Sequence, residues 1–307
     1  MNILRSIVFR LLVSVIGVGQ VQAVTLEISL RSTFNGDPLL LDSLRYPNSA
    51  GETISFTRLS YLVSGFALEG EDGVWIELSD RYAWIDAAKR RTTFQLDDVP
   101  AGKYRALRFQ LGPDAAANTA DPAKLAADHP LNPNLNSLHW SWQGGYIFLA
   151  VEGHYRTGSS ELKGYAYHLA RDPNRTRISL AAPLDLTHNS AALIDFDIGT
   201  LLNAPRPLAF GRDGAATHSR EGDPIAAALV ANLPGAFRVT RILSDSPEIR
   251  RPTPLRPIDL PAKFTPYRFT TPISPPSGPS QWLFQGPPAE SKILAAPMKA
   301  RTFSPAA

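Results

Sequence analysis

The sequence predicts a mainly β protein, an antiparallel β-sandwich with short helices and a Pro-rich C-terminal tail. The first observation is that short segments of alternating apolar and polar residues recur between residues 24 and 243. The second is the turn signals that separate them, such as Asn35-Gly36-Asp37-Pro38 and Pro100-Ala101-Gly102. The third is a change of composition at Ser244, after which about half of the 27 prolines fall in roughly the last fifth of the chain. We therefore expect one β-sandwich domain over residues 24–243 and a disordered tail over residues 244–307.

The first 23 residues are typical of a secretory signal peptide. Arg5 and Arg10 precede a short apolar run over residues 11–18, and Val21-Gln22-Ala23 is a small-residue cleavage pattern. The apolar run is shorter than the about 20 residues that span a bilayer, and no later segment is long enough. We expect an exported protein without stable membrane insertion, beginning near Val24. A retained N-terminal anchor is the alternative.

Alternating residues predict nine strands, and two further segments predict helices. Residues 121–127 start with Asp121 before Pro122, and residues 223–232 start in the same way with Asp223 before Pro224, a pairing typical of helix N-termini. Pro234-Gly235 should end the second helix. The expected strands are residues 24–30, 57–68, 73–78, 92–96, 104–111, 146–155, 165–169, 176–180 and 193–196.

Composition excludes several classes of function. The chain contains no cysteine, which rules out thiolate metal sites, and after removal of the leader Met298 is its only methionine. The net charge of +3 is small and the basic residues are scattered, so nucleic-acid binding is not expected. Because the chain has no phosphate-binding loop, dinucleotide fingerprint or nucleophile elbow, we predict no catalytic activity.

Histidine and tryptophan are concentrated between His129 and Tyr155. Three of the six histidines and two of the five tryptophans lie there. Imidazole is a good copper or zinc ligand, so the segment suggests a metal or redox site rather than a hydrolytic one. No pair has the spacing of a helical metal motif, and strands and loops would have to assemble a site.

The alternation of a strand sorts some of these residues by face. Trp140 and Trp142 share one face if this segment is extended, and His139 points to the other. His168 lies opposite the face of Tyr165 and Tyr167. Core packing is the simpler explanation for the tryptophans taken alone.

Asp195 and Asp197 also share a face of one strand. Paired carboxylates can serve acid–base chemistry or bind calcium. At the end of a strand, solvated or turn-capping carboxylates are the favoured interpretation.

Short motifs in a fixed order make the chain resemble the MbnP-like periplasmic copper-binding proteins. The resemblance covers residues 25–243. The matching segments are residues 59–68 (LSYLVSGFAL), 82–86 (YAWID), 99–104 (VPAGKY), 109–112 (FQLG), 129–132 (HPLN), 140–146 (WSWQGGY), 151–154 (VEGH), 167–169 (YHL), 217–219 (THS) and 234–237 (PGAF).

The resemblance implies a periplasmic β-sandwich that binds copper. It also implies a partner, a secreted dihaem enzyme of the MauG or cytochrome c peroxidase type, which oxidises a tryptophan to a copper-binding kynurenine. Carried onto this chain, Trp142 is the first candidate for that tryptophan and Trp140 the second. The implied copper ligands are His129 and His168, followed by His154 and His218. Some members of the family carry cysteines, and this chain does not.

Two hypotheses from different classes remain open at this point. The first is an exported copper-binding protein for uptake, storage or delivery. The second is a secreted interaction or structural module whose histidines bind nothing. A hydrolase that uses the aspartates ranks last, because no nucleophile or base motif accompanies them.

Overall fold

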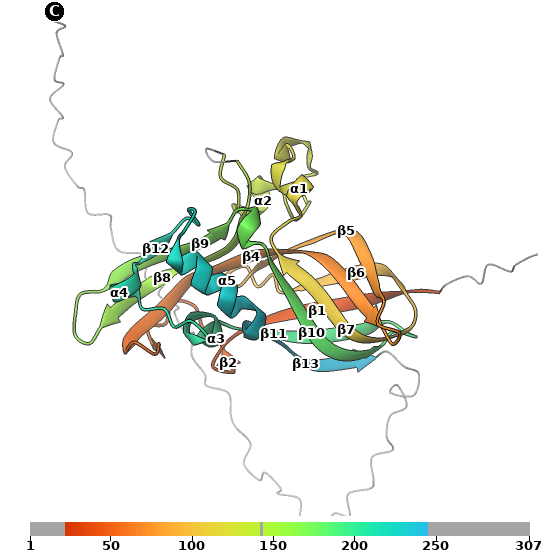
Figure 1. The fold of residues 1–307 in the computed structure, drawn as a ribbon, viewed down its shortest axis with the longest axis horizontal. Helices are drawn as coiled ribbons and strands as arrows, with labels where there is room; N and C mark the ends of the chain where they lie inside the picture. The colour runs from red at the N-terminus through yellow and green to blue at the C-terminus, as the bar shows by residue number, and fades with distance from the viewer. Residues whose placement is uncertain (1–21, 142–143, 245–307) are drawn as a thin grey trace, which may run out of the picture. The chain divides into compact units, whose positions relative to one another are not determined.

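Two β-sheets pack face to face in the computed structural model, which describes residues 22–141 and 144–244 (Figure 1). The smaller sheet has the order β13-β11-β1-β2, with β6 also paired to β1. Its strands are β1 (Ala23–Phe34), β2 (Asp37–Pro38), β6 (Thr93–Pro100), β11 (Ser190–Asp197) and β13 (Phe237–Ser244). The prediction of a mainly β sandwich is confirmed.

The larger sheet has the order β10-β7-β4-β8-β9-β12, with β3 and β5 also paired to β4. Its strands are β3 (Tyr46–Pro47), β4 (Glu52–Gly70), β5 (Trp75–Asp86), β7 (Lys103–Leu111), β8 (Ile147–Thr157), β9 (Lys163–Ala170), β10 (Thr176–Asp185) and β12 (Ala216–Thr217). Each of the nine expected strands overlaps one of those observed, while β13 and the three two-residue strands were not predicted.

Two strand pairings differ from the expected antiparallel arrangement. β1 runs parallel to β11, and β12 runs parallel to β9. The alternation of side chains along a strand is the same for either direction, so the sequence pattern does not distinguish them. The second pairing matters for function, because it brings the segment after β12 alongside β9.

The main hydrophobic core lies between the two sheets. It combines β1 and β11 residues such as Leu26 and Ile194 with residues of the larger sheet such as Tyr61 and Tyr167. Alternation along β9 fills it, because Tyr165, Tyr167 and Leu169 are buried there.

A second, smaller core lies on the opposite face of the larger sheet. On β4, Leu62 belongs to this second core while its neighbours Tyr61 and Val63 belong to the main one. The segment between β7 and β8, called the insert here (residues 112–146), covers this face with Leu131, Leu138 and other side chains. It contains α1 (Ala115–Thr119), the 3₁₀ turn η1 (Pro122–Lys124) and α2 (Pro133–Asn136), and α1 and α2 project together from the sheets in Figure 1.

The helix expected over residues 121–127 is wrong. Asp121 does cap a turn by accepting a hydrogen bond from the Ala123 amide, but only η1 follows. Most of residues 123–128 are exposed, so no packed face extends the turn into a helix.

The second predicted helix, α5 (Pro224–Ala236), is present and longer than expected. Asp223 caps it by accepting hydrogen bonds from the amides of Ile225 and Ala226. Pro234 lies inside the last turn rather than after it, where burial of Leu233 and Ala236 holds that turn on the core. The remaining helical turns are α3 (Ile198–Asn203), η2 (Asp172–Asn174) and α4 (Phe210–Asp213).

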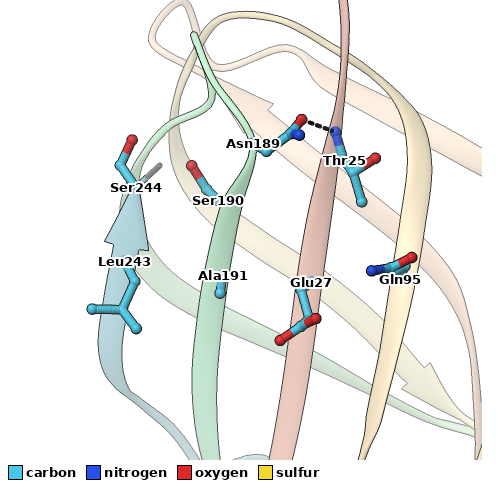
Figure 2. Close-up of a pocket in the computed structure, with 8 residues that line it drawn as sticks. All are labelled: Thr25, Glu27, Gln95, Asn189, Ser190, Ala191, Leu243 and Ser244. Atoms are coloured by element: carbon cyan, nitrogen blue, oxygen red, sulfur yellow. Dashed lines mark hydrogen bonds between the residues drawn. The ribbon is translucent and has the colours of Figure 1, made fainter. Parts of the chain in front are cut away.

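The outward face of the smaller sheet is polar and bears a shallow hollow of about 370 Å³. Figure 2 shows the residues that line it, among them Thr25, whose amide donates to Asn189 Oδ1 at 3.0 Å. None of those labelled is a histidine or a tryptophan. This face is therefore not the place of the predicted metal site.

Two of the expected regions fall largely outside the described residues: the leader, of which residues 1–21 are not described, and the Pro-rich stretch 245–307. Among the helices that are described, none is both long and apolar enough to cross a bilayer.

Candidate metal site

His168 lies near the end of β9, on the outward face of the larger sheet. The alternation that buries Tyr167 and Leu169 turns His168 outward, as predicted from strand parity. The insert and the segment after β12 border this position, so only 14% of the His168 side chain is exposed.

A carboxylate on the neighbouring strand holds one nitrogen of this ring. β8 pairs with β9 so that Ala150 faces His168 and Glu152 faces Ala166, which places Glu152 on the same outward face. Glu152 Oε1 lies 2.9 Å from His168 Nε2. This hydrogen bond, with a smaller contribution from Arg58, outweighs burial and lowers the pKa of Glu152 below its usual value. The ionised carboxylate is an acceptor, so Nε2 carries the proton in the neutral ring.

Arg58 completes a network that fixes Glu152. Its Nη1 donates to Glu152 Oε1 at 3.0 Å, and its Nη2 donates to the Ser137 carbonyl at 3.1 Å. Ser137 ends α2 in the left-handed conformation, with φ at 54°. Arg58 therefore ties β4, β8 and the insert together beside His168.

The other nitrogen of His168 is the notable atom of the site. His168 Nδ1 is buried and has no hydrogen-bond partner within residues 22–141 and 144–244. With the proton on Nε2, Nδ1 carries a lone pair. A histidine whose second nitrogen donates to a carboxylate is the usual arrangement of a metal ligand.

His218 and Trp140 meet His168 from two other segments. Ala216 and Thr217 of β12 pair with Ala166 and Tyr167, so the next residue, His218, reaches the level of His168. The two imidazole centroids lie 5.6 Å apart at 84°. The Trp140 ring, from the end of the insert, lies 6.0 Å from the His168 ring and 5.7 Å from the His218 ring.

Backbone contacts fix these two segments. Ser219 Oγ donates to the His168 carbonyl at 2.8 Å and accepts from the Ala170 amide at 3.0 Å, which holds His218 against β9. The Trp140 carbonyl accepts from the Gly144 amide at 2.9 Å, and the Trp140 amide donates to the Gly145 carbonyl at 3.0 Å. These two hydrogen bonds fix the backbone that carries the indole.

The other histidines lie elsewhere. The His129 ring packs 5.7 Å from the ring of Tyr82, its Nδ1 accepts from the Leu131 amide, and it lines a different hollow. His154 is on the outward face of β8, two residues beyond Glu152, and is exposed. The ring of His139 packs 4.9 Å from that of Tyr146, and burial lowers its pKa. Trp142, the first candidate for modification, lies outside the described residues.

Asp195 and Asp197 have structural roles. Asp195 is fully buried and accepts from Arg31 Nε at 2.8 Å and Arg238 Nη2 at 3.3 Å. Asp197 caps α3 through the Thr200 amide and also accepts from Gly36 N and Thr33 Oγ1. The turn-capping interpretation holds for Asp197, whereas Asp195 is ion-paired rather than solvated.

The described residues bring together two histidines rather than a larger donor set. No group of three or more His, Cys, Asp or Glu side chains in this part of the chain is arranged to hold a metal ion. Sequence reasoning missed Glu152 and Arg58. The alternation of residues 147–155 could have indicated Glu152. If this strand forms a hairpin with residues 165–169, Glu152 lies on the same face of the sheet as His168.

The comparisons with known proteins identify the family of the chain. The family model described as MbnP matches residues 23–216, which is more than half of the chain. The chain belongs to the MbnP family. Among solved structures, a similar one is MbnP from Methylosinus trichosporium, at 13% identity, covering 74% of this chain and 100% of that chain with a TM-score of 0.48. No curated protein matches the sequence. The family model includes Trp140 and His168 and ends two residues before His218.

Proposed function

We propose that this MbnP family member is an exported, periplasmic copper-binding protein that takes up, stores or delivers copper without turnover. Family membership supports the assignment to copper, and the leader-like residues 1–23 support export. Asp195 and Asp197, the residues of the hydrolase alternative, are engaged in an ion pair and in capping α3, respectively.

The observation that carries the proposal is the buried, unpartnered Nδ1 of His168 beside a second imidazole. Leaving a polar atom buried and unpaired costs about 1–3 kcal/mol, which a bound ligand would offset. Glu152 sets the tautomer that frees this lone pair. The donors therefore fit copper: His168 and His218 would hold it, and imidazole sites favour copper over other divalent first-row metals.

A third ligand is proposed to come from an oxidised tryptophan. Trp140 adjoins both histidines, and Trp142 stays a prediction. Oxidation would break the indole C2–C3 bond, add two oxygen atoms, and release the C2 carbon as formate after hydrolysis, leaving an aniline nitrogen and a carbonyl. A dihaem partner would use two peroxide molecules for each tryptophan, each reduced to water as it supplies one oxygen atom.

Copper titration of metal-free protein tests the site. Wild type should show one tight site in competition with a chromophoric chelator. His168→Ala and His218→Ala should each weaken it at least about 10-fold, because two donors dominate the described site. His188→Ala, an exposed histidine bonded to Thr187, is the matched control. Absence of a tight site, or equal weakening by His188→Ala, would refute the proposal and favour an interaction module.

Intact mass and a peptide map of protein purified from its native periplasm test the modification and the export. Conversion of one tryptophan to kynurenine adds about 4 Da, and the fragment that carries it identifies Trp140 or Trp142. The same spectrum shows whether the chain begins near Val24. Unmodified tryptophan with stoichiometric copper would leave a histidine site and remove the need for a dihaem partner.

A further inference from the structure

Another hollow borders the candidate metal site. It has a volume of about 500 Å³ and lies between the connection from β9 to β10 and the connection from β12 to α5. α5 contacts both β9 and η2, and β12 pairs with β9, so β9, β12 and α5 lie side by side (Figure 1). Arg171 lines this hollow and also a smaller one, of about 90 Å³, that Trp140 lines. The volume is within the range of small-molecule sites, roughly 300–1,000 Å³.

Charged side chains of both signs line the larger hollow without partners. Arg171, Arg220 and Glu221 are exposed, and none of the three makes a hydrogen bond or ion pair through its side chain with any other described residue. Here the two cations and the anion are left available to a ligand.

In contrast, the neighbouring carboxylates Asp172 and Asp223 already have hydrogen-bond partners within the protein. Asp172 pairs with Arg175 and accepts from Asn118 Nδ2 at 2.9 Å. Asp223 accepts from the first amides of α5 and from Thr217 Oγ1, so the helix N-terminus is already capped and offers no anion site. Recognition would therefore depend on Arg171, Arg220 and Glu221 alone.

The position of Arg171 is held by the backbone. Its φ of 71° and ψ of 141° lie in a region that side chains other than glycine rarely adopt. Asn174 holds this turn, since its amide donates to the Arg171 carbonyl at 2.9 Å and its Nδ2 donates to the Ala170 carbonyl at 2.8 Å. The guanidinium is thereby presented at the boundary between the two hollows.

We propose that this hollow binds a free α-amino acid. The carboxylate would pair with Arg171 and Arg220, and the ammonium group with Glu221, each through charge-assisted hydrogen bonds. Ala226 and Ala227 give an apolar wall for the side chain of the ligand. A simple anion leaves Glu221 unmatched and a simple cation leaves both arginines unmatched, whereas a zwitterion engages charges of both signs. The proposal does not depend on copper.

Calorimetric titration of the copper-free mature protein at neutral pH tests it. The probes are glycine, leucine, glutamine and phenylalanine. For the amino acid that binds most tightly, two analogues are then titrated, one without the amino group and one without the carboxylate. We expect saturable binding of at least one amino acid, and at least about 10-fold weaker binding of both analogues.

Charge-neutral variants assign the contacts. Arg171→Gln and Arg220→Gln should each weaken binding of the amino acid at least about 10-fold. Glu221→Gln should reduce the affinity for the amino acid to that for the analogue without the amino group. Arg156→Gln, an exposed arginine on β8 outside the hollow, should bind as wild type, and thermal midpoints check that each variant folds. No binding of any probe up to about 10 mM, equal binding of the analogues, or equal loss in Arg156→Gln would each overturn the proposal.

Discussion

At the scale of single residues, His168 is defined by three neighbours with different tasks. The Glu152 carboxylate is hydrogen-bonded to its Nε2, and Ser219 Oγ donates a hydrogen bond to its backbone carbonyl. The His218 ring packs beside its ring. Arg58 in turn fixes Glu152 and the insert. The network therefore leaves a lone pair on Nδ1, because Glu152, its central member, holds the proton on Nε2.

Removing the carboxylate of Glu152 should weaken copper binding while the two histidines remain. Loss of the partner that orients a metal-bound histidine typically costs 10- to 100-fold in affinity, so we expect about 10-fold or more for Glu152→Ala. Glu152→Gln should fall between it and wild type, because an amide oxygen still accepts a hydrogen bond but carries no charge. The measurement is competitive copper titration.

Glu161→Ala, which removes an exposed carboxylate in the turn before β9, is the matched control. Wild-type affinity in Glu152→Ala would show that the carboxylate does not position His168. Loss of affinity in both variants would point to general electrostatics instead.

At the scale of elements, β8 supports the site, because it lies between β4 and β9 and places Glu152 beside both Arg58 and His168. Close approach of the backbones requires a glycine at position 153, where an added Cβ atom would lie 1.9 Å from the Ser55 carbonyl oxygen. The same carbonyl accepts from Tyr165 Oη at 3.1 Å. One glycine therefore permits the contact between β4, β8 and β9.

Gly153→Ala should destabilise the fold by at least about 2 kcal/mol, since overpacking a close backbone contact forces strands apart. Urea unfolding followed by tryptophan fluorescence measures the change. Gly164→Ala is the control on the paired strand: the atom nearest its added Cβ is 3.9 Å away, and we expect a change within about 0.5 kcal/mol. Equal stability of the two variants would contradict the close contact.

At the scale of the whole molecule, ionised carboxylates join elements that are distant in sequence. Asp197 links α3 to the β1–β2 turn, and Glu152 links β8 to β9 and β4. Burial raises the pKa of Asp197, but hydrogen bonds from Thr200, Gly36 and Thr33 outweigh it and hold the pKa below its usual value. In Asp114, burial is likewise outweighed by the hydrogen bonds from Tyr82 and Ala117, and the pKa is lowered.

These lowered pKa values predict acid sensitivity. A carboxyl group whose pKa is lower in the folded state stabilises the fold fully above its unfolded pKa of about 4. That contribution is lost as the pH falls through the folded-state pKa, because the proton then binds the unfolded chain more tightly. The lowered pKa of His139 predicts a small fall in the thermal midpoint between about pH 7 and 5, because the unfolded chain takes up that proton first. The lowered carboxyl pKa values predict a larger fall below about pH 4.

Calorimetry across this range checks the prediction, and Asp197→Asn should show a smaller acid-induced fall than wild type. A thermal midpoint in wild type that does not fall down to about pH 3 would contradict the linkage.

The sequence by itself determined the fold class, most strands and the face of His168. Alternation along residues 165–169 buries Tyr165, Tyr167 and Leu169 and turns His168 outward, and this follows from backbone geometry alone. Asp223 before Pro224 likewise placed the start of α5, because capping is a local interaction. The same local signal failed at Asp121, where no packed face sustains a helix.

Only the tertiary structure decided which of these side chains meet. His218 reaches His168 because β12 pairs in parallel with β9, and Trp140 reaches both because the insert folds over the outward face. Glu152 and Arg58 reach His168 through the register of β4, β8 and β9; alternation within a strand gives their face, and only the pairing of the strands gives their contacts. The resemblance to the MbnP-like proteins ranked His129 as a ligand, yet its ring packs against Tyr82 in another hollow. Periodicity fixes the face of a strand, whereas long-range pairing, which depends on the packing of the whole chain, fixes the partners across it.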